Sequence, residues 1–330
     1  MKPFVSIIIP CRNEEAFIEK CLNSILANDY PKNRMEILVV DGESTDTTRS
    51  IIARIVRQYS YMRIVLLHNE KKITPCALNI GIKKAKGEFI IRMDAHSEYK
   101  SNYISLCVEQ SLAHKADNVG GIFASTPPVD TLIAHSIVEA LSTFFGVGNS
   151  YFRTYPNHYK EVDTVAYGCY KRDVFERIGL YNENLVRCQD MDFNMRLKKA
   201  GGRIILFPDI IAYYYTEATF LKFWQHNFKD GVWAIYAYKF MHTPLKWRHL
   251  LPFFFVMSLV ASVAVSSWLT FTGLGIYIIA NLISSFLVAL RKKDVRYIIS
   301  MPIAYAIRHF GYGIGSVWGG IRLLYEKAYS

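Results

Sequence analysis

Three short polar clusters hold the side chains that are best suited to chemistry in this 330-residue sequence. The first is Asp94-Ala95-His96. Because alternate residues of an extended segment project to the same side, its carboxylate and its imidazole can face one ligand together. An oxygen donor beside an imidazole suits Mn²⁺ or a similar ion better than an all-oxygen Mg²⁺ site does. The alternative interpretation is a capped strand end beside a surface histidine.

The second cluster, residues 41–46, has the sequence Asp-Gly-Glu-Ser-Thr-Asp. Its first member, Asp41, can accept hydrogen bonds from the imide or amide hydrogens of a nucleotide base. Asp-Gly is also a common turn, and an aspartate in a turn can bond its own backbone. The cluster alone therefore leaves a binding role and a structural role open.

The third cluster runs from Gln189 to Arg196 and contains Asp190 and Asp192. Asp190 is a candidate general base, with Asp192 and Arg196 about one helical turn apart and able to fix the local geometry. If Asp190 begins a helix, its carboxylate alternatively does no more than stabilise the helix N-terminus.

Short apolar runs alternate with longer amphipathic ones over residues 1–210, which predicts an α/β fold with a mostly parallel sheet. Strands are expected at residues 5–9, 37–40, 64–67, 89–93, 118–123 and 203–207. Helices are expected at residues 14–28, 46–59, 74–85 and 102–114, the second of them capped by Asp46 or Thr45. Ligands bind beyond the carboxyl ends of parallel strands, where residues 10–15, 41–46 and 94–96 fall. No Gly-x-Gly-x-x-Gly or P-loop motif follows the first strand, which argues against a dinucleotide-binding or P-loop domain.

Taken together and in this order, the clusters resemble glycosyltransferase family 2, which has the GT-A fold, over residues 3–240. The matching stretches are residues 5–15 and 39–46, then Asn79-Ile80-Gly81, Lys86-Gly87-Glu88 and Asp94. Residues 92–99, 167–172, 178–183 and 189–190 resemble the succinoglycan-biosynthesis subgroup. Its members are membrane-associated glucosyltransferases that extend a polyprenyl-diphosphate-linked sugar.

The resemblance implies a role for each matching side chain. It makes Asp190 the catalytic base, with Gln189, Asp192 and Arg196 in support, and makes Asp94 and His96 the metal ligands. The implied nucleotide-sugar-binding residues are Pro10, Asn13, Glu15, Asp41, Ser44, Asp46 and Asp94, with Asp41 reading the base and Asp94 also touching the ribose.

The sequence departs from the family pattern at three places. The metal triplet more commonly ends in Asp, so His96 leaves the identity of the metal open. Gln189 stands where Glu is commoner before the catalytic Asp. Processive members carry Gln-x-x-Arg-Trp, whereas residues 225–229 read Gln-His-Asn-Phe-Lys, which argues against a polymerising synthase.

The implied function is an inverting transfer of a sugar, expected to be glucose, from a UDP-sugar to a polyprenyl-diphosphate-linked saccharide in exopolysaccharide or other surface-glycan synthesis. The cofactor would be a divalent metal, Mn²⁺ or Mg²⁺. One alternative is a polyprenyl-phosphate monosaccharide synthase that uses the same donor site. Another is a non-catalytic membrane scaffold with a degenerate nucleotide-binding domain.

The C-terminal part of the sequence is strongly apolar. Residues 252–270 carry no charge over a length that can cross a bilayer, and residues 273–290 follow after a short link near residues 271–275. A third run, residues 297–320, contains Arg308 and the small-residue series Gly311, Gly315 and Gly319, which predicts a closely packed helix. We therefore expect a catalytic domain at residues 1–240 and a membrane region of two to three helices at residues 241–330.

Charge predicts the orientation of this membrane region. Residues 241–330 hold nine of the 39 Lys and Arg residues but two of the 28 Asp and Glu residues. Basic residues flank both predicted spans, with Lys246, Arg248 and His249 before the first and Arg291, Lys292, Lys293 and Arg296 after the second, which favours a cytoplasmic location for both flanks. The net charge of +11 therefore indicates a lipid bilayer, rather than nucleic acid, as the partner of the basic residues.

The first 240 residues are expected in the cytoplasm of a cell with this protein in its inner membrane. The apolar run at residues 4–9 is too short for a signal peptide. The six cysteines form no Cys-x-x-Cys pair and are predicted to be reduced thiols.

Overall fold

The computed structural model describes residues 1–241 and 250–328. They form two compact units, each continuous in space but not in sequence. The sheet unit comprises residues 1–124 and 155–214, and the helical unit comprises residues 125–154 and 215–330. These units do not coincide with the division at residue 240, because residues 125–154 and 215–240 cluster with the C-terminal helices. The assignment of catalytic and membrane domains stays a prediction.

Four parallel strands form one half of the sheet, in the order β3-β2-β1-β4. They are β1 (Val5–Cys11), β2 (Met35–Asp41), β3 (Arg63–His68) and β4 (Phe89–Arg92). All seven residues of β2 are buried, as expected for a central strand covered on both faces. Each strand lies where an apolar run predicted it.

The other half of the sheet is antiparallel, so the prediction of a mostly parallel sheet holds for the first four strands alone. β8 (Ala166–Lys171) pairs antiparallel with both β4 and β6 (Asn118–Thr126), and β9 (Ile204–Tyr215) pairs antiparallel with β5 (Ser97–Tyr99) and β7 (Lys160–Glu161). β5, β7 and β8 were not among the predicted strands. β5 and β7 are too short to give a periodic pattern.

Helices flank this sheet, namely α1 (Ile18–Leu26), α2 (Thr48–Gln58), α3 (Thr74–Lys84), α4 (Tyr103–Ala113), α8 (Arg172–Ile178) and α9 (Gln189–Lys199), with a 3₁₀ turn, η1, at Lys32–Arg34. The first predicted helix begins four residues late, at Ile18, because Glu14 and Glu15 belong to the loop after β1. The N-cap of α2 is Thr47 and not the predicted Asp46 or Thr45, although Asp46 Oδ1 accepts from the Thr48 N–H at 3.0 Å.

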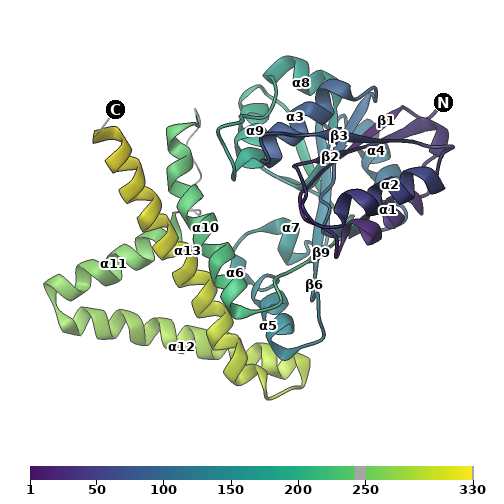
Figure 1. Ribbon diagram of the computed structural model, residues 1–330. Coiled ribbons are helices and arrows are strands. Elements are labelled where there is room, and N and C mark those ends of the chain that lie inside the picture. Colours follow the sequence, from purple (N-terminus) through teal and green to yellow (C-terminus); the bar gives the residue numbers. More distant parts are fainter. Residues whose placement is uncertain (242–249, 329–330) are drawn as a thin grey trace. The chain divides into compact units, whose positions relative to one another are not determined.

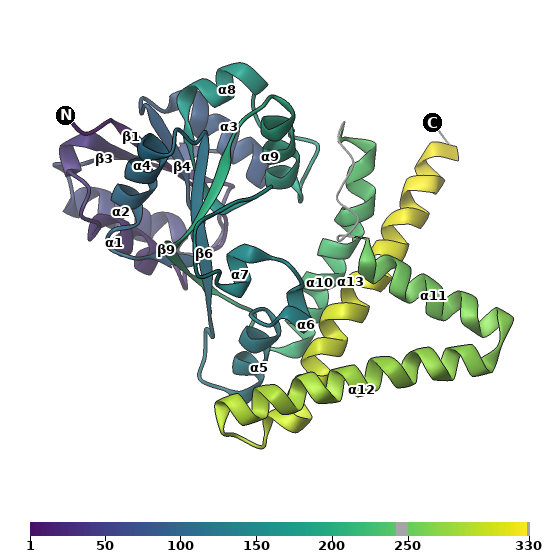
Figure 2. The ribbon, with the colours of Figure 1, turned by 180° about the vertical axis from the view of Figure 1, so that it is seen from behind.

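The helical unit consists of α5 (Leu132–Ala140), α6 (Phe144–Val147), α7 (Tyr151–Thr154), α10 (Phe220–Tyr236), the 3₁₀ turn η2 (Ala237–Lys239), α11 (Leu251–Val265), α12 (Ser267–Lys292) and α13 (Tyr297–Ala328). α10 and α13 lie side by side (Figures 1 and 2). A Cβ added at Gly315 would meet the backbone of Phe228, and one at Gly319 would meet the backbone of Val232. The predicted small-residue face therefore packs closely, against α10.

Arg308 is paired within this unit. Its Nη1 donates to Oδ1 of Asn227 on α10, and its Nε donates to the Gly146 carbonyl at 3.4 Å. A guanidinium at this position in the third apolar run thus finds partners on neighbouring helices.

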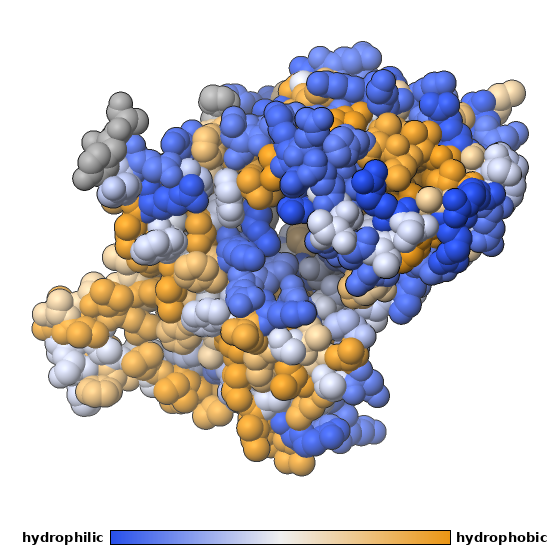
Figure 3. Space-filling model, in the orientation of Figure 1, coloured by the Kyte–Doolittle hydropathy of each residue, from blue (hydrophilic) through white to orange (hydrophobic). Residues whose placement is uncertain are grey.

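The predicted first span is not one helix. α11 ends at Val265, and Ser266 is extended (φ −166°, ψ 128°), so the chain turns there and the predicted link near residues 271–275 lies inside α12. One described helix, α12, is long and apolar enough to cross a membrane, and α11 is a shorter apolar helix. Lys246, Arg248 and His249 lie outside the described residues. The surface over α11 and α12 is largely hydrophobic (Figure 3).

Candidate active site

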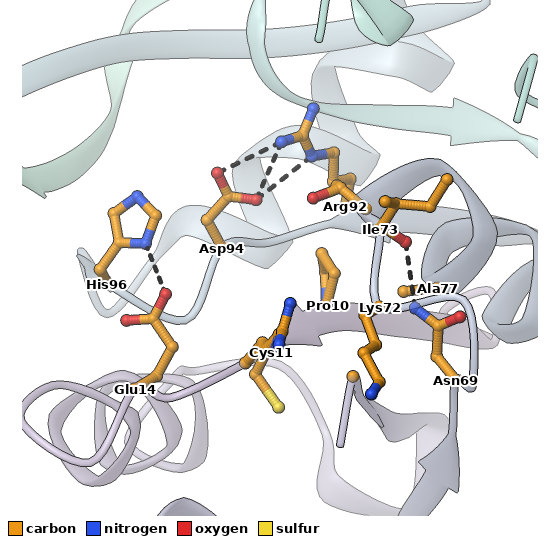
Figure 4. Close-up of a pocket in the computed structure, with 13 residues that line it drawn as sticks. Pro10, Cys11, Glu14, Asn69, Lys72, Ile73, Ala77, Arg92, Asp94 and His96 are labelled. Atoms are coloured by element: carbon orange, nitrogen blue, oxygen red, sulfur yellow. Dashed lines mark hydrogen bonds and ion pairs between the residues drawn. The ribbon is translucent and has the colours of Figure 1, made fainter. Parts of the chain in front are cut away.

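A pocket of about 210 Å³ lies in the sheet unit at the carboxyl ends of the parallel strands (Figure 4). Each of the four strands is followed by residues that reach it. The lining consists of Pro10 and Cys11 at the end of β1 with Arg12 and Glu14 after it, Gly42 after β2, Asn69, Lys72, Ile73, Thr74 and Ala77 after β3, and Arg92 at the end of β4 with Asp94 and His96 after it. The pocket is therefore where ligands bind in sheets of this kind.

Asp94 and His96 both line this pocket, as their spacing predicted. Asp94 accepts hydrogen bonds from Arg92, with Nη2 3.0 Å from Oδ1 and 3.2 Å from Oδ2. His96 lies with Nδ1 3.2 Å from Oε1 of Glu14, a contact drawn in Figure 4. Its ring meets Tyr214 edge-on, with centroids 5.5 Å apart. Both side chains are thus held by neighbouring residues. The contacts of His96 with Glu14 and Tyr214 differ from what the alternative interpretation, a surface histidine beside a capped strand end, predicts.

The donor set fits a metal ion that arrives with its substrate. Among the described residues no group of three or more His, Cys, Asp and Glu side chains is arranged to hold an ion alone. Asp94 and His96 supply one carboxylate and one imidazole. Mg²⁺ is commonly bound through one or two carboxylates plus substrate phosphates, so an ion held by this pair would need oxygens of a substrate diphosphate to complete its shell.

Two cations that the sequence analysis did not select also line the pocket. Arg12 follows β1, and Lys72 precedes α3 with its ammonium paired to Glu43. Guanidinium and ammonium groups bind phosphate oxygens. Arg12 could have been identified from the sequence, because it lies within residues 5–15, a stretch that carries the family resemblance.

Four of the predicted nucleotide-binding residues form a hydrogen-bonded clasp between two loops. The Asn13 N–H donates to Ser44 Oγ at 2.9 Å. The Glu15 N–H donates to Asp46 Oδ2 at 3.2 Å. Glu15 Oε2 also accepts from the Thr47 hydroxyl at 2.7 Å. These contacts join the loop after β1 to the loop after β2. None of the four lines the pocket, whereas Pro10 and Asp94 do.

Asp41 lies beneath the clasp and is fully buried. Both its oxygens lie within hydrogen-bond distance of the Ser44 N–H, at 3.3 and 3.2 Å, and the Arg49 guanidinium is 3.6 Å from Oδ2. Its carboxylate contacts the thiol of the pocket residue Cys11, whose pKa is raised by burial and by the charge of Asp41. Asp41 thus sits behind the pocket wall.

Asp190 lies in the first turn of α9, which begins at Gln189 after Cys188 in the left-handed region (φ 63°). Its Oδ2 forms an ion pair with Nη1 of Arg92. Its Oδ1 is buried and has no hydrogen-bond partner within residues 1–241 and 250–328. A buried oxygen without a donor is costly unless a ligand supplies one. Asp190 is not among the residues that line the pocket, and Oδ1 is the oxygen of its carboxylate that no described donor satisfies.

The supporting residues fix α9 and the loop before it. Asp192 is buried and accepts from Nε of Arg196 at 2.9 Å, so the two lie together as their spacing predicted. Arg196 also donates to the carbonyl of Leu180 at 2.8 Å. Gln189 is buried at the start of the helix.

Arg92 is the residue that sequence reasoning missed. It ends β4, and its guanidinium contacts Asp94 on one side and Asp190 on the other. Burial acts to lower the pKa of Arg92, but the electrostatic interactions with Asp94, Tyr181 and Tyr167 and the hydrogen bond to Asp94 together outweigh it and raise the pKa. Arg92 therefore stays a cation and joins the two acidic clusters.

Known proteins resemble this chain over most of its length. It is 29% identical over 310 residues to dolichyl N-acetyl-alpha-D-glucosaminyl phosphate 3-beta-D-2,3-diacetamido-2,3-dideoxy-beta-D-glucuronosyltransferase of Methanococcus voltae, covering 93% of this chain and 94% of that protein. It is 31% identical over 224 residues to the succinoglycan biosynthesis protein ExoA of Rhizobium meliloti, covering 67% of this chain and 66% of that protein.

Among solved structures, the mannosyltransferase PcManGT from Pyrobaculum calidifontis, in complex with GDP-Man and Mn²⁺, matches with a TM-score of 0.63 and 18% identity. The match covers 96% of this chain and 88% of that chain, and it shows that the fold is GT-A. The sequence model described as Glycosyl transferase family 2 matches residues 6–179, just over half of the chain. On this evidence the chain belongs to glycosyltransferase family 2 and is a glycosyltransferase.

Proposed function

We propose that this glycosyltransferase moves a sugar from a UDP-sugar to a lipid-linked saccharide with inversion at the anomeric carbon, and that Asp190 is its general base. The observation that carries the proposal is the buried, unpartnered Oδ1 of Asp190, on a carboxylate that Arg92 links to Asp94 of the pocket. A base must lie within hydrogen-bond reach of the proton that it removes, and Oδ1 has no competing donor among the described residues.

The proposed reaction is a single displacement. Oδ1 of Asp190 takes the proton of the acceptor hydroxyl as its oxygen forms the new bond to the anomeric carbon. The bond from that carbon to the diphosphate oxygen breaks, and its electron pair leaves on the nucleoside diphosphate. One attack from the face opposite the leaving group converts an α-linked donor into a β-linked product.

Asp94 and His96 are proposed to hold a divalent metal, Mn²⁺ or Mg²⁺. When bound, such an ion neutralises the negative charge of the diphosphate. Arg12 and Lys72, which also line the pocket, would add positive charge. Pro10 lines the pocket proposed for the nucleotide, and the clasp of Asn13, Glu15, Ser44 and Asp46 keeps two of its loops in place. Asp41, buried behind this pocket, is proposed to read the base.

The acceptor is proposed to be a saccharide on a polyprenyl diphosphate, with glucose as the transferred sugar and a surface glycan as the end product. The names of the two relatives support a lipid-linked saccharide acceptor and a glycan product, because one is a transferase for a dolichyl-linked N-acetylglucosaminyl phosphate and the other takes part in succinoglycan biosynthesis. Glucose and the diphosphate are proposed from the resemblance to the succinoglycan-biosynthesis subgroup. A relative whose acceptor already carries a sugar favours this activity over a polyprenyl-phosphate monosaccharide synthase.

The exposed apolar helices support a location at the membrane. α11 and α12 expose residues such as Phe254, Val263, Trp268, Phe271 and Leu287. Exposed apolar surface on this scale marks an interaction with lipid or with another protein. We propose that these helices enter the inner membrane in more than one pass and that the sheet unit lies in the cytoplasm, where nucleotide-sugars are made.

The activity is tested with membranes that contain the full chain. Labelled UDP-glucose, UDP-N-acetylglucosamine and GDP-mannose are each supplied with polyprenyl phosphate or with a polyprenyl-diphosphate-linked monosaccharide. We expect label from UDP-glucose on the lipid-linked saccharide, in β linkage by NMR. Label on polyprenyl phosphate alone would instead establish the synthase, and an α-linked product would contradict inversion.

A further inference from the structure

Arg92 is mostly buried, with 12% of its side chain exposed, and it lies between two carboxylates that are far apart in the sequence. Nη2 and Nε face Asp94, at 3.0 and 3.3 Å from Oδ1, as Figure 4 shows for the Arg92–Asp94 pair. Nη1 forms the ion pair with Oδ2 of Asp190. One guanidinium thus forms ion pairs with Asp94, after β4, and with Asp190, in α9.

The shape of the guanidinium accounts for this double contact. Its donors lie in one plane and point in fixed directions, so opposite edges can bind two carboxylates at the same time. The Tyr167 ring, whose centroid is 6.0 Å from the guanidinium carbon, adds a cation–π contact. An ammonium group in this position would bring the same charge without the fixed geometry.

The contact determines which oxygen of Asp190 is available. Because Oδ2 is held by Arg92, the carboxylate cannot exchange its oxygens by rotation without breaking the ion pair. Oδ1 is the oxygen left without a partner within the described part of the chain. The other edge of the same guanidinium is anchored to Asp94, which lines the pocket.

We propose that Arg92 is a positioning residue that aligns Asp190 with the donor held at Asp94. It does not touch the reacting atoms but acts through the two carboxylates. The inference rests on the proposed function, since it takes Asp190 as the base and Asp94 as part of the donor site. It assigns a role to Arg92, which the resemblance over residues 92–99 left without one.

The test compares Arg92→Lys and Arg92→Ala with Arg177→Lys, a matched control on the surface that pairs with Asp117 and Asp173. Transfer is measured at saturating donor, and UDP affinity is measured by calorimetry without acceptor. We expect kcat to fall about 10- to 100-fold in Arg92→Lys, the loss typical of a small misplacement of reacting groups. UDP affinity should change much less, and the control should keep both values.

Two further measurements separate alignment from a purely structural role. Free guanidinium ion should restore part of the transfer by Arg92→Ala. In an Asp190→Asn background, Arg92→Lys should cause little additional loss, because residues that act as a unit are not additive. Full additivity, wild-type turnover by Arg92→Lys, or an equal loss of UDP affinity and kcat would each overturn the proposal.

Folding failure also gives an answer. If both Arg92 variants lose folded UDP binding, the ion pairs hold the unit together and the alignment proposal is wrong. If Asp190→Asn keeps wild-type turnover, the proposed function fails, whatever Arg92 does. If Asp190→Asn loses transfer while Arg92→Lys does not, this inference alone fails.

Discussion

His96 is the residue at which the sequence departs most from the family pattern and yet lines the pocket beside Asp94. We predict that His96→Ala weakens donor binding in the presence of Mn²⁺ but leaves metal-free UDP binding unchanged, because the imidazole is proposed to bind only the ion. Calorimetry with Mn²⁺, with Mg²⁺ and with excess chelator measures this, and His158→Ala, an exposed histidine, is the control. Full transfer in chelator would contradict metal dependence.

Glu183 offers a pH-dependent test of the loop before α9. It accepts from Lys71 Nζ at 2.7 Å and from the Asn79 amide at 3.0 Å, and these bonds, led by Lys71, lower its pKa from 4.5 to about 2. A depressed folded-state pKa adds stability above pH 4.5, which is lost as the pH falls toward 2.

We therefore predict that Glu183→Gln lowers the stability of the purified protein at pH 7 by about 0.5–1 kcal/mol, a value discounted for solvent screening of a partly exposed pair. The difference from wild type should shrink as the pH falls from 4.5 toward 2. Denaturant melts across this range measure it. A difference that is constant with pH would show that the Glu183 carboxylate is not stabilised in the folded state.

At the scale of elements, strands and helices with strong periodicity were predictable and long-range contacts were not. β1 and β2 are buried apolar runs, so their positions follow from hydrophobicity alone. β8 could not be assigned from its own pattern, because its antiparallel place between β4 and β6 is fixed by pairing. The break at Ser266 was missed since apolar composition continues through it, and hydropathy does not register a change of backbone direction.

The acidic members of the site were predictable, but the partners of those acids were not. Asp94, His96 and Asp190 follow strands or begin helices, and local spacing shows this. Arg92 pairs with Asp190 across 98 positions of sequence, which only the fold brings together. The clasp of Asn13 with Ser44 has the same origin: it needs β1 and β2 side by side.

The packing of α10 against α13 is tested with two glycines of the same helix. At Gly315 a methyl group would meet the backbone of Phe228, whereas at Gly320 the nearest atom is a methyl carbon of Ile235 at 3.8 Å. Gly315→Ala should therefore destabilise the protein by about 1–3 kcal/mol through overpacking. Gly320→Ala should be neutral or stabilise it by up to about 1 kcal/mol, through helix propensity.

Thermal unfolding of both variants in detergent measures these effects. Equal melting temperatures for Gly315→Ala and Gly320→Ala would mean that α10 and α13 do not approach as closely as described.

At the scale of the whole molecule, the account depends on how the apolar helices enter the bilayer. The positive-inside bias predicts that Arg291, Lys292, Lys293 and Arg296 lie on the cytoplasmic side, together with the proposed catalytic residues. We predict that a single cysteine at Ser266, at the turn between α11 and α12, labels from outside intact cells and that one at Lys293 does not. Cys188 is replaced by Ser, because the other five native cysteines are buried.

Labelling of Lys293 from outside would reverse the orientation and remove the cytoplasmic donor site with it. A shielded cysteine at both positions would mean that the α11–α12 turn stays within the membrane and that the multi-pass proposal is wrong.

The central claim is that Asp190 removes the proton of the acceptor hydroxyl, and single-turnover transfer by Asp190→Asn tests it most directly. An amide cannot take that proton, so we predict a rate about 10²- to 10⁴-fold below wild type, with UDP affinity nearly unchanged. Asp209→Asn, an exposed carboxylate in β9, is the matched control and should transfer normally. Near wild-type transfer by a folded Asp190→Asn protein would contradict the account.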